Sequence, residues 1–196
     1  MSTGPMHPYL ARELVIRASR ADEHWARLAR VQLTDQMVGA GRHIDHVNAE
    51  WLARVVADYG WPDVPLVGEG GARAAWRLAL RADTRADFQR LASRVMLEAV
   101  ERGTASLRQW AHLYDRCLAV ADRPQYYGTQ YRLGPDGPQM QTVSEPACDL
   151  DARRAAVGLP PAGAALQSLQ GRLAAKPRFD RNGYGDAPAA VLLDAA

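Results

Sequence analysis

The chain has 196 residues, of which 47% are hydrophobic and 23% charged, enough for one compact domain and too few for two large ones. The 24 Lys and Arg residues against 22 Asp and Glu give a formal net charge of +2 at pH 7, which excludes the strongly basic surface of a dedicated nucleic-acid-binding protein. No apolar run is long enough to cross a membrane, and the first residues lack the basic and apolar regions of a signal peptide, so we expect a cytoplasmic protein without membrane contact.

In the N-terminal part of the chain, apolar side chains recur every three or four positions, the period of amphipathic helices. The first such helix is predicted over 6–38. After a break at Gly39-Ala40-Gly41, a second should begin at Asp45, a good N-cap residue, and end at Gly60-Trp61-Pro62, because glycine terminates helices and proline cannot continue them. After a Gly- and Pro-rich loop over 63–71, a third helix is predicted over 72–82.

Two further helices follow. Thr84 and Asp87 have the spacing of a capping box, which predicts a fourth helix that begins there and ends before Gly103. The apolar residues that come next have helical spacing over 106–121 and predict a fifth helix.

The pattern changes in the C-terminal third of the chain. The segment 125–143 has a Gly- and Pro-rich turn between two short extended runs, which predicts a small hairpin or an ordered loop. Asp149 or Asp151 is placed to cap a brief helix, and a last helix is expected over 164–174. Beyond it, 176–196 is rich in Pro, Gly, Asp and Ala, and we expect a flexible tail.

These elements predict a mainly α fold, a single compact domain of about five to seven helices over residues 1–175, with a small β-hairpin or ordered loop near 125–143. Cys117 and Cys148 are the only cysteines and lack C-x-x-C spacing, so we expect neither a structural zinc site nor a disulfide. Both are predicted to be buried as small apolar side chains.

The first cluster with catalytic potential is His43-Ile44-Asp45-His46. In one interpretation Asp45 is a general base, and His43 or His46 tunes it. Two histidines three residues apart around a carboxylate also resemble part of a metal site, but the sequence fixes no further ligand, so we predict no bound metal. The simplest alternative is that Asp45 caps the helix and the histidines are solvated.

The second cluster is a pair of arginines on the third predicted helix. Arg77 and Arg81 are four residues apart and therefore lie on one helical face, and Asp83 follows where the helix closes. Two guanidinium groups on one face suit a carboxylate, phosphate or sulfate. The competing interpretation, in an arginine-rich chain, is a solvated face or a surface ion pair.

Two more clusters lie further along the chain. Asp115-Arg116, in the fifth predicted helix, is either an ion pair that locks packing or a charged lining of a cavity. The segment 123–131 concentrates hydroxyl and amide groups, which need partners once they are buried. It therefore predicts either a polar pocket or a loop whose polar groups are satisfied internally. Its candidate residues are Gln125, Tyr127, Thr129 and Gln130.

Several motifs in a fixed order resemble a known family. They are Asp45-x-x-Asn48, Gly60-Trp61-Pro62, Gly68-Glu69, Ala82-Asp83, Gln89, Asp115-Arg116, Gln125-x-Tyr127-Gly128-Thr129-Gln130 and Arg153-Arg154-x-x-Val157-Gly158-Leu159-Pro160. From about Asp35 to Leu159, this set resembles domain of unknown function 6624, an uncharacterised bacterial family. The resemblance implies a helical domain with no established general activity. Arginine usage agrees with a high-GC bacterial genome, because Lys176 is the only lysine.

The chain departs from this family at one motif. Where the family pattern has Gln-His-Ala-Asp, this chain has Leu80-Arg81-Ala82-Asp83, so an amide and an imidazole are replaced by an apolar and a cationic side chain. Either the site is degenerate in this chain, or Arg81 now holds an anionic group. We adopt the second interpretation.

We therefore expect a cofactor-independent bacterial enzyme of specialised metabolism, which applies acid/base catalysis to a small metabolite carrying a carboxylate, phosphate or sulfate. An elimination or an intramolecular displacement or cyclisation needs only such groups. The sequence has no nucleotide-binding loop, serine-hydrolase elbow or zinc-protease motif. The catalytic candidates are Asp45, His43 and His46. The substrate-binding candidates are Arg81, Asp83, Asp115, Arg116, Gln125, Tyr127, Thr129 and Gln130.

Two other functions stay open. In the first, the chain is a non-catalytic protein that binds a small molecule in the same pocket, or docks a partner protein or second copy through exposed aromatic residues such as Trp61. In the second, it is a metal-dependent enzyme that uses His43, Asp45 and His46 as ligands.

Overall fold

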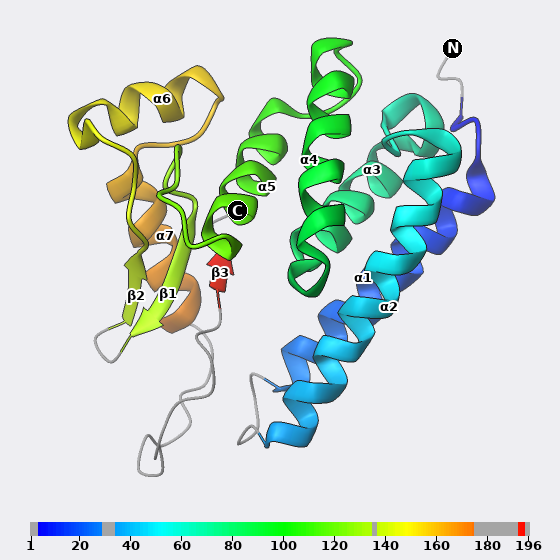
Figure 1. Ribbon diagram of the computed structural model, residues 1–196, viewed down its shortest axis with the longest axis horizontal. Coiled ribbons are helices and arrows are strands. Elements are labelled where there is room, and N and C mark those ends of the chain that lie inside the picture. The colour runs from blue at the N-terminus through cyan, green and yellow to red at the C-terminus, as the bar shows by residue number, and fades with distance from the viewer. Residues whose placement is uncertain (1–3, 29–33, 135–136, 175–191, 195–196) are drawn as a thin grey trace.

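Figure 1 shows the computed structural model, which describes residues 4–28, 34–134, 137–174 and 192–194. The helices in this part of the chain are α1 (Pro8–Leu28), α2 (Asp35–Tyr59), α3 (Val64–Leu80), α4 (Ala86–Glu101), α5 (Leu107–Val120), α6 (Leu150–Ala156) and α7 (Ala162–Ala174). The 3-10 turns are η1 (Asp83–Arg85) and η2 (Ala147–Asp149), and the strands are β1 (Gln130–Gly134), β2 (Gly137–Met140) and β3 (Leu192–Asp194). The predicted mainly α fold is confirmed.

Helices α1 to α5 form a bundle, and the small sheet lies with α6 and α7 to one side of it (Figure 1). The long helices α1 and α2 run antiparallel to each other, and α1 also packs extensively against α3. Every helix of the bundle contributes a large apolar side chain to one core, in which each is at most 1% exposed. Examples are Leu14, Leu52, Leu78, Met96 and Leu113.

The predicted hairpin is confirmed as the antiparallel pair β1 and β2, in which Tyr131 lies opposite Met140. A third strand, β3, pairs antiparallel with the other edge of β1, which gives the strand order β2-β1-β3. Strand β3 falls within the predicted flexible tail, 176–196, and was not expected from the sequence. The other residues of that tail lie outside the described part of the chain.

The boundary between the first two helices was predicted wrongly. Helix α1 ends at Leu28, and α2 begins at Asp35, where the Thr34 hydroxyl accepts a hydrogen bond from the Met37 amide at 3.3 Å. Asp45 therefore lies in the middle of α2 and does not cap it. Gly41 was interpreted as part of a break before this helix, but it lies inside α2, packed closely against α1.

The starts of α3 and α4 also differ from the prediction. The predicted loop over 63–71 is the first half of α3, which begins after the N-cap Asp63 and is kinked at Gly68, where φ is 71°. Helix α4 has no Thr84 capping box, because η1 precedes it and its N-cap makes no side-chain hydrogen bond. The Thr84 hydroxyl instead meets the His46 ring at 3.1 Å. These departures follow from contacts between helices, which local spacing does not report.

Two predictions near the C-terminus were half right. The expected helices are confirmed as α6 and α7, but the side chain of Asp149 makes no capping hydrogen bond. The Asp151 carboxylate instead caps α7, accepting a hydrogen bond from the Ala162 amide at 2.7 Å. Of the two cysteines, Cys117 is partly buried, whereas Cys148 is exposed, contrary to prediction. Burial raises the pKa of the Cys117 thiol to about 12.

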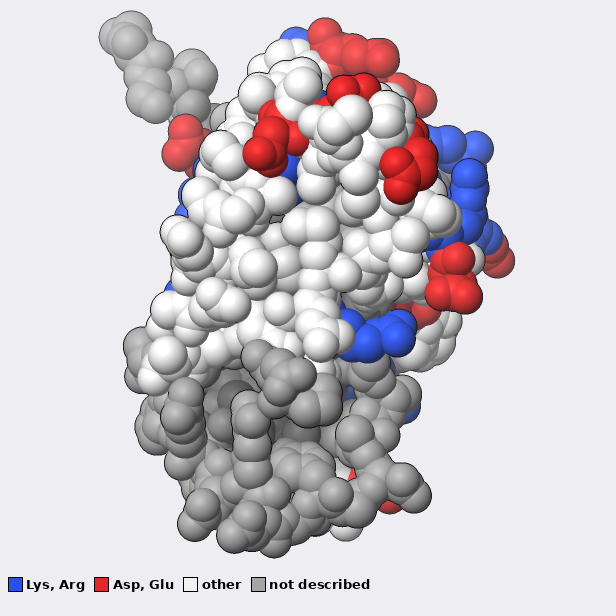
Figure 2. All heavy atoms as spheres, turned by 90° about the vertical axis from the view of Figure 1, so that its left-hand side faces the viewer, with Lys and Arg blue, Asp and Glu red and all other residues white. Residues whose placement is uncertain are grey.

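The surface and the aromatic residues add two observations. Figure 2 shows the side of the molecule that carries α6 and α7, with acidic side chains at its upper end, basic ones at its right-hand margin and uncharged side chains across its middle. Trp61, which was expected to be exposed, is only 2% exposed and packs into the main core. Among the described residues, no helix is long and apolar enough to span a membrane.

Candidate functional site

A buried carboxyl group at the centre of α2 marks the candidate site. Asp45 is 8% exposed, and its Oδ2 accepts a hydrogen bond from the indole N–H of Trp25 on α1 at 2.9 Å. Its Oδ1 is buried without a hydrogen-bond partner among the described residues. Burial raises the pKa of Asp45 to about 6, against the lowering effects of the Arg81 charge, the Trp25 hydrogen bond and His24. The nearby charge of Asp83 raises the pKa further.

Next to Asp45, the end of α3 presents two guanidinium groups that share one carboxylate. Arg77 and Arg81 both pair with Asp22 of α1, the second at 2.7 Å between Nη2 and Oδ1. Nη1 of Arg81 is buried without a hydrogen-bond partner in the described part of the chain. Burial lowers the pKa of Arg81, but a guanidinium remains charged near neutral pH. We call Asp22, Trp25, Asp45, Arg77 and Arg81 the Asp45–Arg81 cluster.

The charges of this cluster nearly balance. Two arginines face Asp22 and Asp45, and the pKa of Asp45 is close to neutral. When Asp45 is protonated, the cluster carries one positive charge in excess. A small anion would compensate that charge, whereas an ionised Asp45 already does so.

Beyond Arg81, a second set of polar side chains connects the bundle to the sheet. Asp83 of η1 receives two hydrogen bonds from Arg116 of α5, from Nε at 2.9 Å and from Nη2 at 2.6 Å. The remaining terminal nitrogen of Arg116 donates to the Gln130 side chain of β1 at 3.1 Å. Gln89 of α4 donates to Asp83 at 3.2 Å and to the Ala79 carbonyl at 3.0 Å. We call Asp83, Gln89, Arg116 and Gln130 the Asp83–Arg116 network.

Asp115 holds the segment before β1 in place. Its carboxylate accepts hydrogen bonds from the backbone amides of Tyr126, Tyr127 and Thr129 and from the Thr129 hydroxyl, all between 2.9 and 3.0 Å. Burial raises the pKa of Asp115, while these four hydrogen bonds lower it. Gln125 accepts from the Gln130 amide at 2.7 Å and donates to the Gln130 carbonyl at 3.0 Å.

These contacts favour one of the two interpretations of the segment 123–131. Asp115, Gln125, Thr129 and Gln130 are each 0% exposed, and their side chains form hydrogen bonds within the loop and to α5. The arrangement is that of an internally satisfied loop, and it supports the Asp83–Arg116 network through Gln130.

The two histidines near Asp45 do not join it in one site. His43 is exposed, while the ring of His46 lies against η1 and within 3.6 Å of the Glu50 carboxylate. No group of three or more His, Cys, Asp or Glu side chains suited to a metal ion occurs among the described residues.

Two hollows of about 310 and 380 Å³ lie outside the Asp45–Arg81 cluster, one near the start of α3 and one beside α2.

The sequence analysis missed two members of the cluster and one buried cation. Neither Asp22 nor Trp25 was identified as a site residue, because their partners lie on other helices. Arg154 is 1% exposed and donates to the carbonyls of Tyr127 and Gly128 at 2.7 and 3.0 Å, so its charge stabilises the same loop as Asp115. Its pairing with Arg153 in one motif was the only signal in the sequence.

Comparison with known proteins agrees with the resemblance noted in the sequence and extends it. A search of curated proteins and a search of solved structures gave no match. A family model described as "Family of unknown function (DUF6624)" matches residues 11–176, a longer stretch than the motifs span. The chain belongs to this family.

Proposed function

We propose that the chain is a cofactor-independent enzyme of specialised metabolism, in which Asp45 takes a proton from a small substrate and Arg81 holds the substrate's carboxylate, phosphate or sulfate. One observation carries the proposal: Asp45 Oδ1 and Arg81 Nη1 are both buried without hydrogen-bond partners among the described residues, and their charges interact. Unpaired buried polar atoms are costly. A group that donates to Asp45 and accepts from Arg81 would satisfy both atoms.

The raised pKa of Asp45 suits a general base. A carboxyl group with a pKa of about 6 is mostly ionised at pH 7, and it binds a proton more tightly than an ordinary aspartate does. Trp25 fixes one carboxylate oxygen, which leaves Oδ1 as the proton acceptor.

The charge balance suits the departure of an anion. In the proposed step, Oδ1 of Asp45 takes a proton from a carbon or heteroatom of the substrate. The electron pair left behind forms a new double bond or ring bond, and the anionic group leaves with the electron pair of the broken bond. Because protonated Asp45 leaves the cluster with an excess positive charge, Arg81 stabilises the leaving group as its charge develops. The step is an elimination or an intramolecular displacement.

The other predicted site residues have a supporting role in this proposal. Asp83, Arg116 and Gln130 hold the end of α3 against α5 and β1 and so fix the position of Arg81. Asp115, Gln125, Tyr127 and Thr129 act behind them by ordering the loop before β1. His43 is left without a role, since it is exposed.

A test of the anion site is a thermal-shift titration with sulfate, phosphate and acetate. We expect at least one of them to stabilise wild type, by about 2.7 kcal/mol at a hundred times its dissociation constant. Arg81→Gln should abolish the shift, Asp45→Asn should keep it, and Arg54→Gln, a change to an exposed arginine elsewhere on α2, should leave it intact. If none of the anions stabilises wild type, or if Arg81→Gln shifts equally, the anion site is wrong.

A second candidate function is binding of an anion without catalysis at the same cluster, favoured by the two guanidinium groups of Arg77 and Arg81 that share the single carboxylate of Asp22. The two functions differ in what Asp45→Asn does. A catalyst incubated with mixtures of small carboxylates, phosphate esters and sulfate esters forms a product that mass spectrometry detects with wild type and not with Asp45→Asn. A binding protein forms no product with either.

A further inference from the structure

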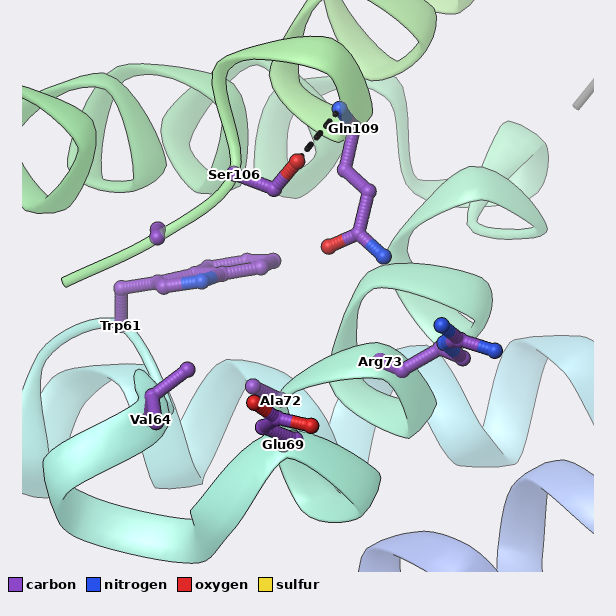
Figure 3. Close-up of a pocket in the computed structure, with 8 residues that line it drawn as sticks. Trp61, Val64, Glu69, Ala72, Arg73, Ser106 and Gln109 are labelled. Carbon is purple, nitrogen blue, oxygen red and sulfur yellow. Dashed lines mark hydrogen bonds between the residues drawn. The ribbon is translucent and has the colours of Figure 1, made fainter.

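A hollow of about 310 Å³ at the start of α3 is built from three segments of the chain (Figure 3). Trp61 comes from the turn between α2 and α3, Glu69 and Arg73 come from α3, and Ser106 and Gln109 come from the start of α5. Its volume falls within the range of small-molecule pockets. None of its lining residues belongs to the Asp45–Arg81 cluster, whose nearest member along α3, Arg77, lies about 6 Å beyond Arg73 along the helix axis.

Around this hollow, the Ser106 hydroxyl accepts a hydrogen bond from the Gln109 backbone amide at 3.3 Å, but three other polar side chains, those of Glu69, Arg73 and Gln109, have no side-chain partner in the described part of the chain. Glu69 and Arg73 are one turn apart on α3, a spacing that often gives an ion pair, yet neither forms an ion pair or a side-chain hydrogen bond with a described residue. Figure 3 shows the Gln109 side chain extending from α5 into the space between α5 and α3, with the Arg73 guanidinium on the side away from Trp61. The hollow therefore offers a free carboxylate, a free guanidinium and an amide.

The remaining wall is apolar. Trp61 is 2% exposed, so the core holds its ring and only a small part of the ring faces the hollow, while Val64, Ala72 and Ala105 supply the rest of the apolar surface. The wall is fixed by the backbone as well, because the Val64 amide donates to the Thr104 carbonyl at 3.1 Å and so ties the start of α3 to the segment before α5. A preformed wall of this kind suits a flat or branched apolar group.

We propose that this hollow binds a free α-amino acid with an apolar side chain. The Glu69 carboxylate would take the ammonium group and the Arg73 guanidinium would take the carboxylate. The apolar wall at Val64 and Ala105 would contact the side chain. A purely anionic ligand would meet repulsion from Glu69, and a purely cationic one from Arg73. A zwitterion whose two charges are a few ångströms apart matches two side chains that are one helical turn apart. The site is independent of the proposed reaction at Asp45.

Isothermal titration calorimetry of the full chain tests this site, with L-phenylalanine, L-tryptophan and L-leucine as probes. We expect saturable binding of at least one of them. Phenylacetate, which lacks the ammonium group, and phenethylamine, which lacks the carboxylate, should bind about tenfold more weakly than L-phenylalanine or not at all, since each loses one charge-assisted interaction.

Two variants locate the binding. Glu69→Gln and Arg73→Gln should each weaken amino-acid binding about tenfold, while Arg54→Gln, at an exposed arginine on α2, should leave it unchanged. Because Glu69 and Arg73 are exposed, both variants are expected to fold, and a thermal melt checks this. The proposal is overturned if no probe binds up to about 10 mM, or if the two variants bind as wild type does.

Discussion

At the scale of single residues, Asp45 is defined by what surrounds its two oxygens. Trp25 donates to one oxygen, while the other is buried without a hydrogen-bond partner among the described residues. Removal from water disfavours the charged form, so the pKa rises from its ordinary value of 3.8 to about 6. The same burial that makes Asp45 a stronger base therefore makes its ionised form, which predominates at neutral pH, destabilising for the folded chain.

This destabilisation is measurable as a pH-dependent difference in the free energy of unfolding between wild type and Asp45→Asn. Because the pKa of Asp45 is higher in the folded chain than in the unfolded chain, its contribution to stability is fully present below about pH 4 and is lost as the pH rises through 6. The free energy of unfolding of wild type, minus that of Asp45→Asn, should fall by on the order of 3 kcal/mol between about pH 4 and pH 7. Urea denaturation at a series of pH values measures it.

Asp58→Asn is the matched control for that measurement. Asp58 lies on the same helix, is exposed, and forms no ion pair or side-chain hydrogen bond with a described residue. Its difference from wild type should stay nearly flat over the same range. A flat or rising curve for Asp45→Asn would show that burial does not raise the pKa of Asp45.

At the scale of elements, the contact between α1 and α2 depends on one glycine. A Cβ atom built on Gly41 would lie 2.8 Å from Cζ2 of the Trp25 ring, closer than real side chains approach. Gly39, half a turn earlier on the same helix, has no atom within 4 Å of its Cβ position. The two glycines of one short motif therefore differ in their roles, and only Gly41 permits the approach that brings Trp25 to Asp45.

Replacing each glycine by alanine separates these roles. Gly39→Ala should stabilise the chain by up to about 1 kcal/mol, because alanine is the better helix former and meets nothing. Gly41→Ala gains the same propensity but must displace the Trp25 ring, and overpacking of this kind costs about 1–3 kcal/mol. We expect Gly41→Ala to be less stable than Gly39→Ala by at least about 1 kcal/mol in urea denaturation. Equal stabilisation by both changes would mean that the ring moves aside freely.

These same contacts explain how far the sequence could predict the molecule. Helix spacing and turn residues are local, so they predicted α4 to α7 and the hairpin, and α5, predicted over 106–121, differs from its prediction by one residue at each end. Gly41 was misinterpreted as a helix break because the contact that requires a glycine there is with Trp25, which lies on another helix. Likewise, Asp45 and Arg81 stood out by residue type, whereas Asp22 and Trp25 were not identified, because they join the cluster only through the packing of α1 on α2 and α3. Strand β3 forms by pairing with β1, and its Pro-, Gly- and Ala-rich segment has no local pattern that predicts this pairing.

At the scale of the whole molecule, the bundle and the sheet are joined by buried polar contacts as well as by packing. Arg116 of α5 spans the junction, with two hydrogen bonds to Asp83 at the end of α3 and one to Gln130 of β1. The Arg116 side chain is 11% exposed and the Asp83 side chain 37%, so their attraction is only partly screened by water. Through this junction, β1 supports the end of α3, where Arg81 lies.

Asp83→Asn should loosen this junction. The substitution leaves the Arg116 guanidinium largely buried without its carboxylate, which we expect to cost on the order of 1–3 kcal/mol, less than for a fully buried pair because Asp83 is partly exposed. The loss should concentrate at the sheet, so that backbone amides of β1 exchange with deuterium faster while those in the middle of α1 change little. Asp87→Asn, at a side chain that is 98% exposed, is the control and should leave both rates unaltered. Equal acceleration in α1 and β1 would mean that the network stabilises the fold as a whole and does not join two parts of it.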